Sequence, residues 1–153
     1  MLYQLRNLKD SEKQEFFKGP YMVALLIGGA DGELSNKEID RVSEVIHVKT
    51  YSEKNDLEDF YKILDAQEAA DEMNSILNAM PVAWEERHAE LTNRLSALGA
   101  ALKKLDKAYA VQYYNSLKDI AVQIANASGG VFGVGQINES EHEMLTLSMI
   151  EKP

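Results

Sequence analysis

The chain has 153 residues, 45% of them hydrophobic and 27% charged, which is typical of a single soluble globular domain with a complete core. Its formal net charge of −9, from 25 acidic and 16 basic residues, argues against nucleic-acid binding and against docking on anionic lipid by charge alone. Cysteine is absent, which excludes disulfides, thiolate zinc sites and cysteine nucleophiles and suits a reducing cytosol.

Helical spacing of apolar residues begins close to the amino terminus. Ser11 can cap a short helix that ends near Gly19. Pro20 suits the first turn of a second helix, because a proline there gives up no hydrogen bond. Gly28-Gly29 loosens the end of that helix and Gly32 stops it.

Three further helices are expected before Pro81. Ser35 is the predicted cap of the first of these helices and Ser52 the predicted cap of the next, and the last ends before Pro81. Each of these helices has one face of hydrophobic residues at helical spacing. Lys49 falls on that face in the helix that begins at Ser35. These apolar residues are Ile39, Val42, Val45, Ile46, Leu57, Phe60, Tyr61, Leu64, Met73, Ile76, Leu77 and Met80.

The second half of the chain predicts three more helices. The clearest stripe of apolar spacing runs from Trp84 to Leu102 and includes His88, which we expect to be a hydrogen-bonded core residue. Asp106 is the expected cap of a long helix, and a last helix precedes the carboxyl terminus. Strand alternation is hard to find. The sequence therefore predicts an all-α fold, a single domain over residues 1–153 with six to eight helices.

An acidic turn sequence follows an apolar helix twice. The first copy, residues 29–38, reads Gly-Ala-Asp-Gly-Glu-Leu-Ser-Asn-Lys-Glu. The second reads Asn-Ala-Ser-Gly over residues 126–129, continues through an insertion, and resumes as Ile-Asn-Glu-Ser-Glu over residues 137–141. This repetition predicts a pseudo-two-fold arrangement with repeats over about residues 20–50 and 108–150.

The turn residues allow two interpretations. Ser35-x-x-Glu38 and Asn138-x-x-Glu141 are both helix-capping sequences, and capping alone can explain them. If the two repeats pack together, however, the carboxylates of Asp31, Glu38 and Glu141 can converge, and converging carboxylates repel unless a cation or proton lies between them. Oxygen ligands of this kind suit calcium, magnesium or manganese and, less specifically, zinc. The spacing is not that of an EF-hand.

The two turn sequences resemble those of the TerB-like family of tellurite-resistance-associated proteins. The resemblance implies an all-helical pseudo-repeat fold, a cytoplasmic location that includes complexes close to the membrane, and a stress-response role with partner proteins. It also implies metal binding through Asp31, Glu38 and Glu141. Ser128 departs from the family pattern by replacing the second aspartate, and the insertion moves Glu141 away from its turn.

A di-metal carboxylate bundle is an alternative, because each histidine follows a glutamate by three residues, as in the Glu-x-x-His ligands of di-iron proteins. His47 lies on the polar face of its helix, and this direction argues against that alternative. The glycine-rich residues 129–135 lack the lysine of a phosphate-binding loop, and Phe132 there is a candidate partner contact. No nucleophile elbow or catalytic triad order is found. We therefore expect a non-enzymatic module that binds a divalent cation, a protein partner, or both; the remaining alternative is a metal-free helical interaction domain.

Overall fold

The structure, a computed structural model, describes residues 2–28, 36–52, 55–128 and 145–153. Within these residues the chain forms six α-helices and a short 3-10 helix, η1 (Tyr3–Leu5), and contains no strand. One hydrophobic core joins all of the helices, so the prediction of an all-helical single domain is confirmed. The α-helices are α1 (Asp10–Gly28), α2 (Asn36–Ser52), α3 (Glu58–Asp65), α4 (Ala69–Asn78), α5 (Trp84–Leu102) and α6 (Lys107–Ser128).

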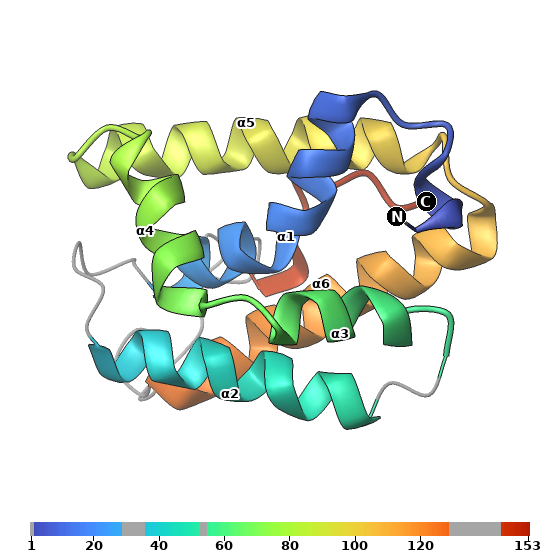
Figure 1. Ribbon diagram of the computed structural model, residues 1–153. Coiled ribbons are helices and arrows are strands. Elements are labelled where there is room, and N and C mark those ends of the chain that lie inside the picture. Colours follow the sequence, from blue (N-terminus) through green and yellow to red (C-terminus); the bar gives the residue numbers. More distant parts are fainter. Residues whose placement is uncertain (1, 29–35, 53–54, 129–144) are drawn as a thin grey trace.

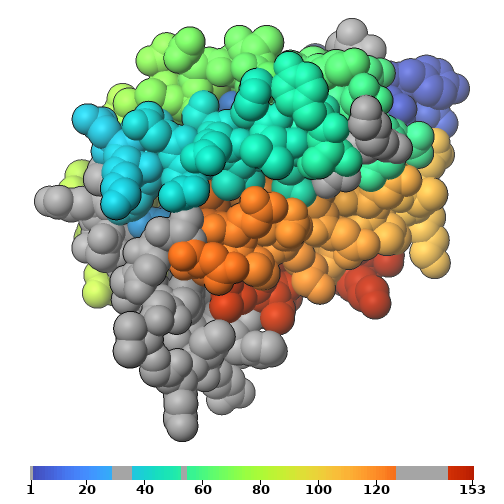
Figure 2. Space-filling model, turned by 90° about the horizontal axis from the view of Figure 1, so that it is seen from below, coloured from blue at the N-terminus to red at the C-terminus, as the bar shows by residue number. Residues whose placement is uncertain are grey.

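Helix α1 lies at the centre of the fold. It crosses between α5 on one side and α6 with α2 on the other (Figure 1), and it packs most extensively against α6 and α5. Every residue from Gly19 to Gly28 is buried, as expected for a helix that is covered on all sides. Figure 2 shows α2 and α6 side by side on one face of the molecule. None of the described helices is both long enough and apolar enough to cross a membrane.

The predicted break between two helices at Gly19 and Pro20 is wrong, because α1 continues through Pro20. Proline has no N–H to donate to the Phe16 carbonyl four residues earlier. The Tyr113 hydroxyl on α6 donates to that carbonyl instead, at 2.7 Å. Helix α1 bends near its middle (Figure 1), as expected at an interior proline.

Glycine at position 19 is what allows Tyr113 to approach the backbone of α1. A Cβ atom there would overlap the Tyr113 hydroxyl oxygen. The Tyr113 ring is fully buried and stacks on Phe16 with ring centroids 4.0 Å apart. Tyr109, Tyr113 and Tyr114 are all buried, and the Tyr113 hydroxyl points inward to the backbone of α1.

The start of α3 also differs from the prediction. Ser52 is the last residue of α2 and does not cap α3. The turn before α3 is instead held by Asn55, whose side-chain oxygen accepts a hydrogen bond from the Leu57 amide at 2.9 Å. The predicted apolar face of this helix is confirmed, since Phe60, Tyr61 and Leu64 are buried.

Ion pairs tie α1 and both ends of the described chain to α5 and its turn. Arg94 on α5 binds Glu15 on α1 through two parallel hydrogen bonds of 2.7 and 2.6 Å. Two further pairs, Arg6 with Asp106 and Lys103 with Glu151, place the first and last described residues beside the turn between α5 and α6 (Figure 1). The second turn sequence lies largely within residues 129–144, outside the described part of the chain, so the pseudo-two-fold repeat is not confirmed.

Candidate functional site

Glu38, one of the three candidate metal ligands, lies in the first turn of α2. A carboxylate in this position is favoured by the partial positive charge at the amino-terminal end of a helix. The residue is half-buried, and its Oε2 atom is buried. Helix α2 thus holds this carboxylate against the body of the protein rather than in open solvent.

The ends of α1 and α6 meet beside Glu38. A Cβ atom on Gly28, the last residue of α1, would lie 3.4 Å from Ile124 Cγ2 on α6 and 3.7 Å from Glu38 Oε2. Ile124 precedes the end of α6 by about one turn. The carboxyl-terminal end of α1 therefore lies against the last turns of α6, with the Glu38 carboxylate beside the end of α1.

The other two candidate ligands, Asp31 and Glu141, lie outside the described residues, as does Ser35, the expected cap. Among the described residues no group of three histidine, aspartate or glutamate side chains is arranged to hold a metal ion. The three-carboxylate site therefore stays a prediction, with the position of Glu38 as its described part.

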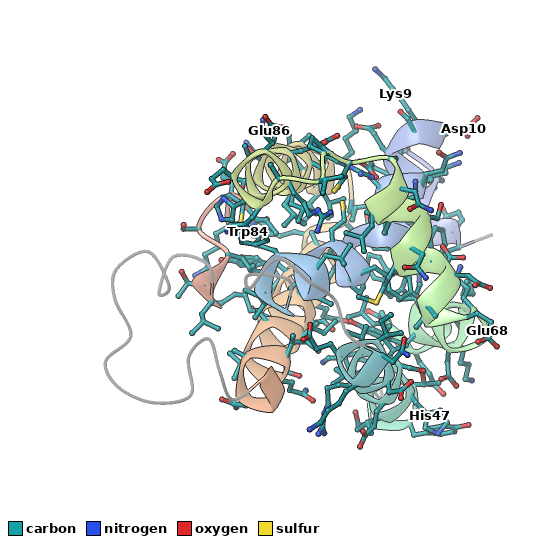
Figure 3. All side chains as sticks on the ribbon, turned by 90° about the vertical axis from the view of Figure 1, so that its left-hand side faces the viewer. Lys9, Asp10, His47, Glu68, Trp84 and Glu86 are labelled. Carbon is teal, nitrogen blue, oxygen red and sulfur yellow. The ribbon has the colours of Figure 1, made fainter. Side chains whose placement is uncertain are left out.

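The two described histidines do not form the centre of a di-metal bundle. The His47 side chain is 58% exposed, as its place on the polar face predicted, and its Nδ1 atom lies 3.0 Å from Asp65 Oδ1. His88 is half-buried at the edge of the core, where its ring lies 5.4 Å from that of Trp84, so the expected core position is wrong. Figure 3 shows His47 and Trp84 at well-separated places on the molecule.

A buried polar cluster at the contact of α2, α3 and α6 was not predicted from the sequence. The Lys49 side chain is only 4% exposed, and its Nζ atom lies 2.7 Å from Asp119 Oδ2 and 5.7 Å from the centre of the Tyr61 ring. The Tyr61 hydroxyl is hydrogen-bonded to Ser116, so all three helices contribute. The signal in the sequence was the register of Lys49, which falls on the apolar face of α2.

This cluster predicts a specific acid sensitivity. Burial raises the pKa of Asp119, but the hydrogen bond and charge of Lys49, helped by Gln123, outweigh burial and hold this pKa below its ordinary value of 3.8. Because the folded-state pKa is the lower one, the stabilisation is complete above pH 3.8 and is lost as the pH falls through the folded-state value. Urea unfolding at pH values from 6 down to 2.5 should therefore show a shallower loss of stability in Asp119→Asn than in the wild type. The exposed Asp71→Asn is the control, and equal slopes for all three proteins would contradict the prediction.

Comparison of the chain with protein-family models, with curated proteins and with solved structures found no match. The TerB-like resemblance therefore rests on the two turn sequences alone. Any functional assignment has to be argued from the residues and from the geometry described above.

Proposed function

We propose that this protein is a non-enzymatic, TerB-like helical interaction module that binds a divalent cation where α1, α2 and α6 meet. The observation that carries the proposal is the position of Glu38, whose Oε2 atom lies beside Gly28 at the end of α1, next to Ile124 near the end of α6. A cation held there by Glu38, with Asp31 and Glu141 as the further proposed ligands, would join the two repeats and fix their relative position. The resemblance adds a cytoplasmic stress-response role to this proposal.

The cation would act by stabilising one arrangement of the helices. A ligand that binds only the folded state, at a concentration about 100-fold above its Kd, stabilises a protein by about 2.7 kcal/mol. For a chain of this size, such stabilisation corresponds to a rise in Tm of about 5–10 °C. Of calcium, magnesium, manganese and zinc, at least one at millimolar concentration should therefore raise the Tm of the metal-stripped protein.

Glu38→Gln is expected to abolish the ion-induced rise in Tm. Without any ion, the same substitution should lower stability only by about 0.5–2 kcal/mol, the size of a lost capping interaction. Asp40→Asn is a matched control, because Asp40 is an exposed carboxylate on the same helix. Thermal unfolding of the three proteins with and without each ion measures both effects.

Two outcomes would count against the proposal in different ways. An equal ion-induced rise in the wild type and in Glu38→Gln would remove Glu38 from the ligand set. No rise with any ion in the wild type would favour the metal-free interaction module, in which the acidic turns serve only as helix caps.

A further inference from the structure

Two acidic residues meet two polar residues of α6 where the chain enters α3. Asp56 lies in the turn before α3, and Asp59 lies in the first turn of that helix. Gln112 Nε2 on α6 donates a hydrogen bond to Asp56 Oδ2 at 3.4 Å, which places the start of α3 beside the first half of α6 (Figure 1). Tyr109 precedes Gln112 by three residues, so both lie on the face of α6 that is turned toward Asp56.

Two oxygen atoms of this cluster are buried without a partner. The Tyr109 hydroxyl oxygen and Gln112 Oε1 are shielded from water, and neither has a hydrogen-bond partner within the described part of the chain. Tyr109 as a whole is only 3% exposed, and its ring is nearly parallel to that of the fully buried Phe16, with centroids 6.0 Å apart. A buried polar atom without a partner costs free energy, so two such atoms side by side indicate a missing ligand.

The electrostatic environment of these atoms is negative. Burial raises the pKa of the Tyr109 hydroxyl to about 12, and the negative charges of Asp56 and Asp59 contribute to the rise. Both carboxylates therefore lie close enough to act on this hydroxyl. Because the charges that act on it are negative, Lys13, one turn before Phe16 on α1, does not neutralise the cluster at this point.

The basic residue of α3 is also engaged elsewhere. Lys62 pairs with Glu58 on the surface of the helix, with Nζ 3.2 Å from Oε1. The cluster thus has an outer edge of two exposed carboxylates and an inner edge of two uncharged oxygen atoms. All four groups can accept from, or coordinate, a cation that enters between the carboxylates.

The charge and size of such a cation follow from these groups. Carboxylate, amide and hydroxyl oxygens are hard ligands that suit alkali and alkaline-earth ions. A divalent ion is disfavoured, because the cost of removing its water rises with the square of its charge and calcium takes about six to eight oxygen ligands. Among monovalent ions, size decides. Neither buried oxygen has room for a water molecule beside it, and a potassium ion is about as large as water, whereas a bare sodium ion is smaller.

We propose that Asp56, Asp59, Tyr109 and Gln112 form a sodium-binding site that fastens the start of α3 to α6. The ion takes the Tyr109 hydroxyl oxygen and Gln112 Oε1 as inner ligands and the two carboxylates as outer ligands, and water completes its shell on the exposed side. The site is separate from the one at Glu38, because Gln112 precedes Ile124 by about 18 Å along α6.

Thermal unfolding in sodium chloride and in potassium chloride, with a chelator present, tests the proposal. Equal concentrations of the two salts keep the screening of surface charges the same. Sodium at about tenfold its Kd should raise the Tm of the wild type by about 3–5 °C relative to potassium. Asp56→Asn should lose this difference, whereas Asp71→Asn, which replaces an exposed aspartate of α4, should keep it. Glu38→Gln should also keep it, which separates this test from that of the divalent site.

Tyr109→Phe distinguishes a ligand from a merely structural hydroxyl. In potassium chloride the substitution removes an unpartnered buried group, so the Tm should be unchanged or slightly higher. In sodium chloride it should lower the Tm relative to the wild type, because a ligand is lost. Sodium-23 NMR gives a direct measurement, since the wild type should broaden the sodium signal more than Asp56→Asn does.

Three results would overturn the sodium site. The first is an equal Tm of the wild type in the two salts throughout a sodium titration. The second is a sodium-specific rise in Tm that persists in Asp56→Asn or in Tyr109→Phe. The third is equal broadening of the sodium-23 signal by the wild type and by Asp56→Asn.

Discussion

Gly19→Ala is expected to lower the free energy of unfolding by about 3 kcal/mol. The added methyl group would overlap the Tyr113 hydroxyl and come within 3.2 Å of Leu98 Cδ2 on α5. Tyr113 is fully buried and cannot retreat without giving up its hydrogen bond to the Phe16 carbonyl. That carbonyl would then be left without a donor, because Pro20 has none to offer.

The same prediction can be tested by a double-mutant cycle. Tyr113→Phe should cost about 1–3 kcal/mol by leaving the Phe16 carbonyl without its donor. Removing the hydroxyl also makes room for the methyl group, so the double variant should be much less destabilised than the sum of the two single variants. Gly28→Ala is the control, because its methyl group would make only ordinary contacts of 3.4 and 3.7 Å and alanine favours the helix. The cycle is measured by urea unfolding. Additive costs of the two substitutions would contradict the close approach of the Tyr113 hydroxyl to Gly19.

The second large effect is an asymmetry between the two partners of the buried ion pair. Asp119→Ala should cost about 2 kcal/mol, because it leaves the ammonium group of Lys49 in a nearly water-free position. The value is below the roughly 3–5 kcal/mol of fully buried pairs because half of the Asp119 side chain is already in water. Lys49→Met should cost less than about 1 kcal/mol, since it leaves behind a carboxylate that water can solvate.

Urea unfolding of both single variants and of the double variant near neutral pH measures this asymmetry. The double variant should be close to Lys49→Met in stability, because no buried charge remains in either. Lys62→Met serves as a control for the loss of a lysine, since the Lys62 side chain is 57% exposed and pairs with Glu58 on the surface of α3. Equal costs for Asp119→Ala and Lys49→Met would show that the burial of Lys49 does not determine the energy of the pair.

The candidate cation site shows how far the sequence can be taken. The capping pattern correctly placed Glu38 in the first turn of a helix, because such patterns depend on residues only a few positions apart. That Glu38 lies against Gly28 of α1, which in turn contacts Ile124 of α6, depends on how three helices pack. Asp31 and Glu141 lie outside the described residues, so their part in the site stays a prediction.

The sequence by itself determined the helical class of the fold and most of the buried faces. The period of apolar residues is a local property, and it correctly marked Phe60 and Leu64 on α3 and the leucine stripe of α5. Only the tertiary structure decided that α1 passes through Pro20, because the hydroxyl that serves the Phe16 carbonyl comes from a residue 97 positions later in the chain. The buried Lys49 pair was likewise decided by helices that meet only in the folded protein. Local patterns fix which side of a helix turns inward, whereas the partners that satisfy its buried polar groups are fixed by packing.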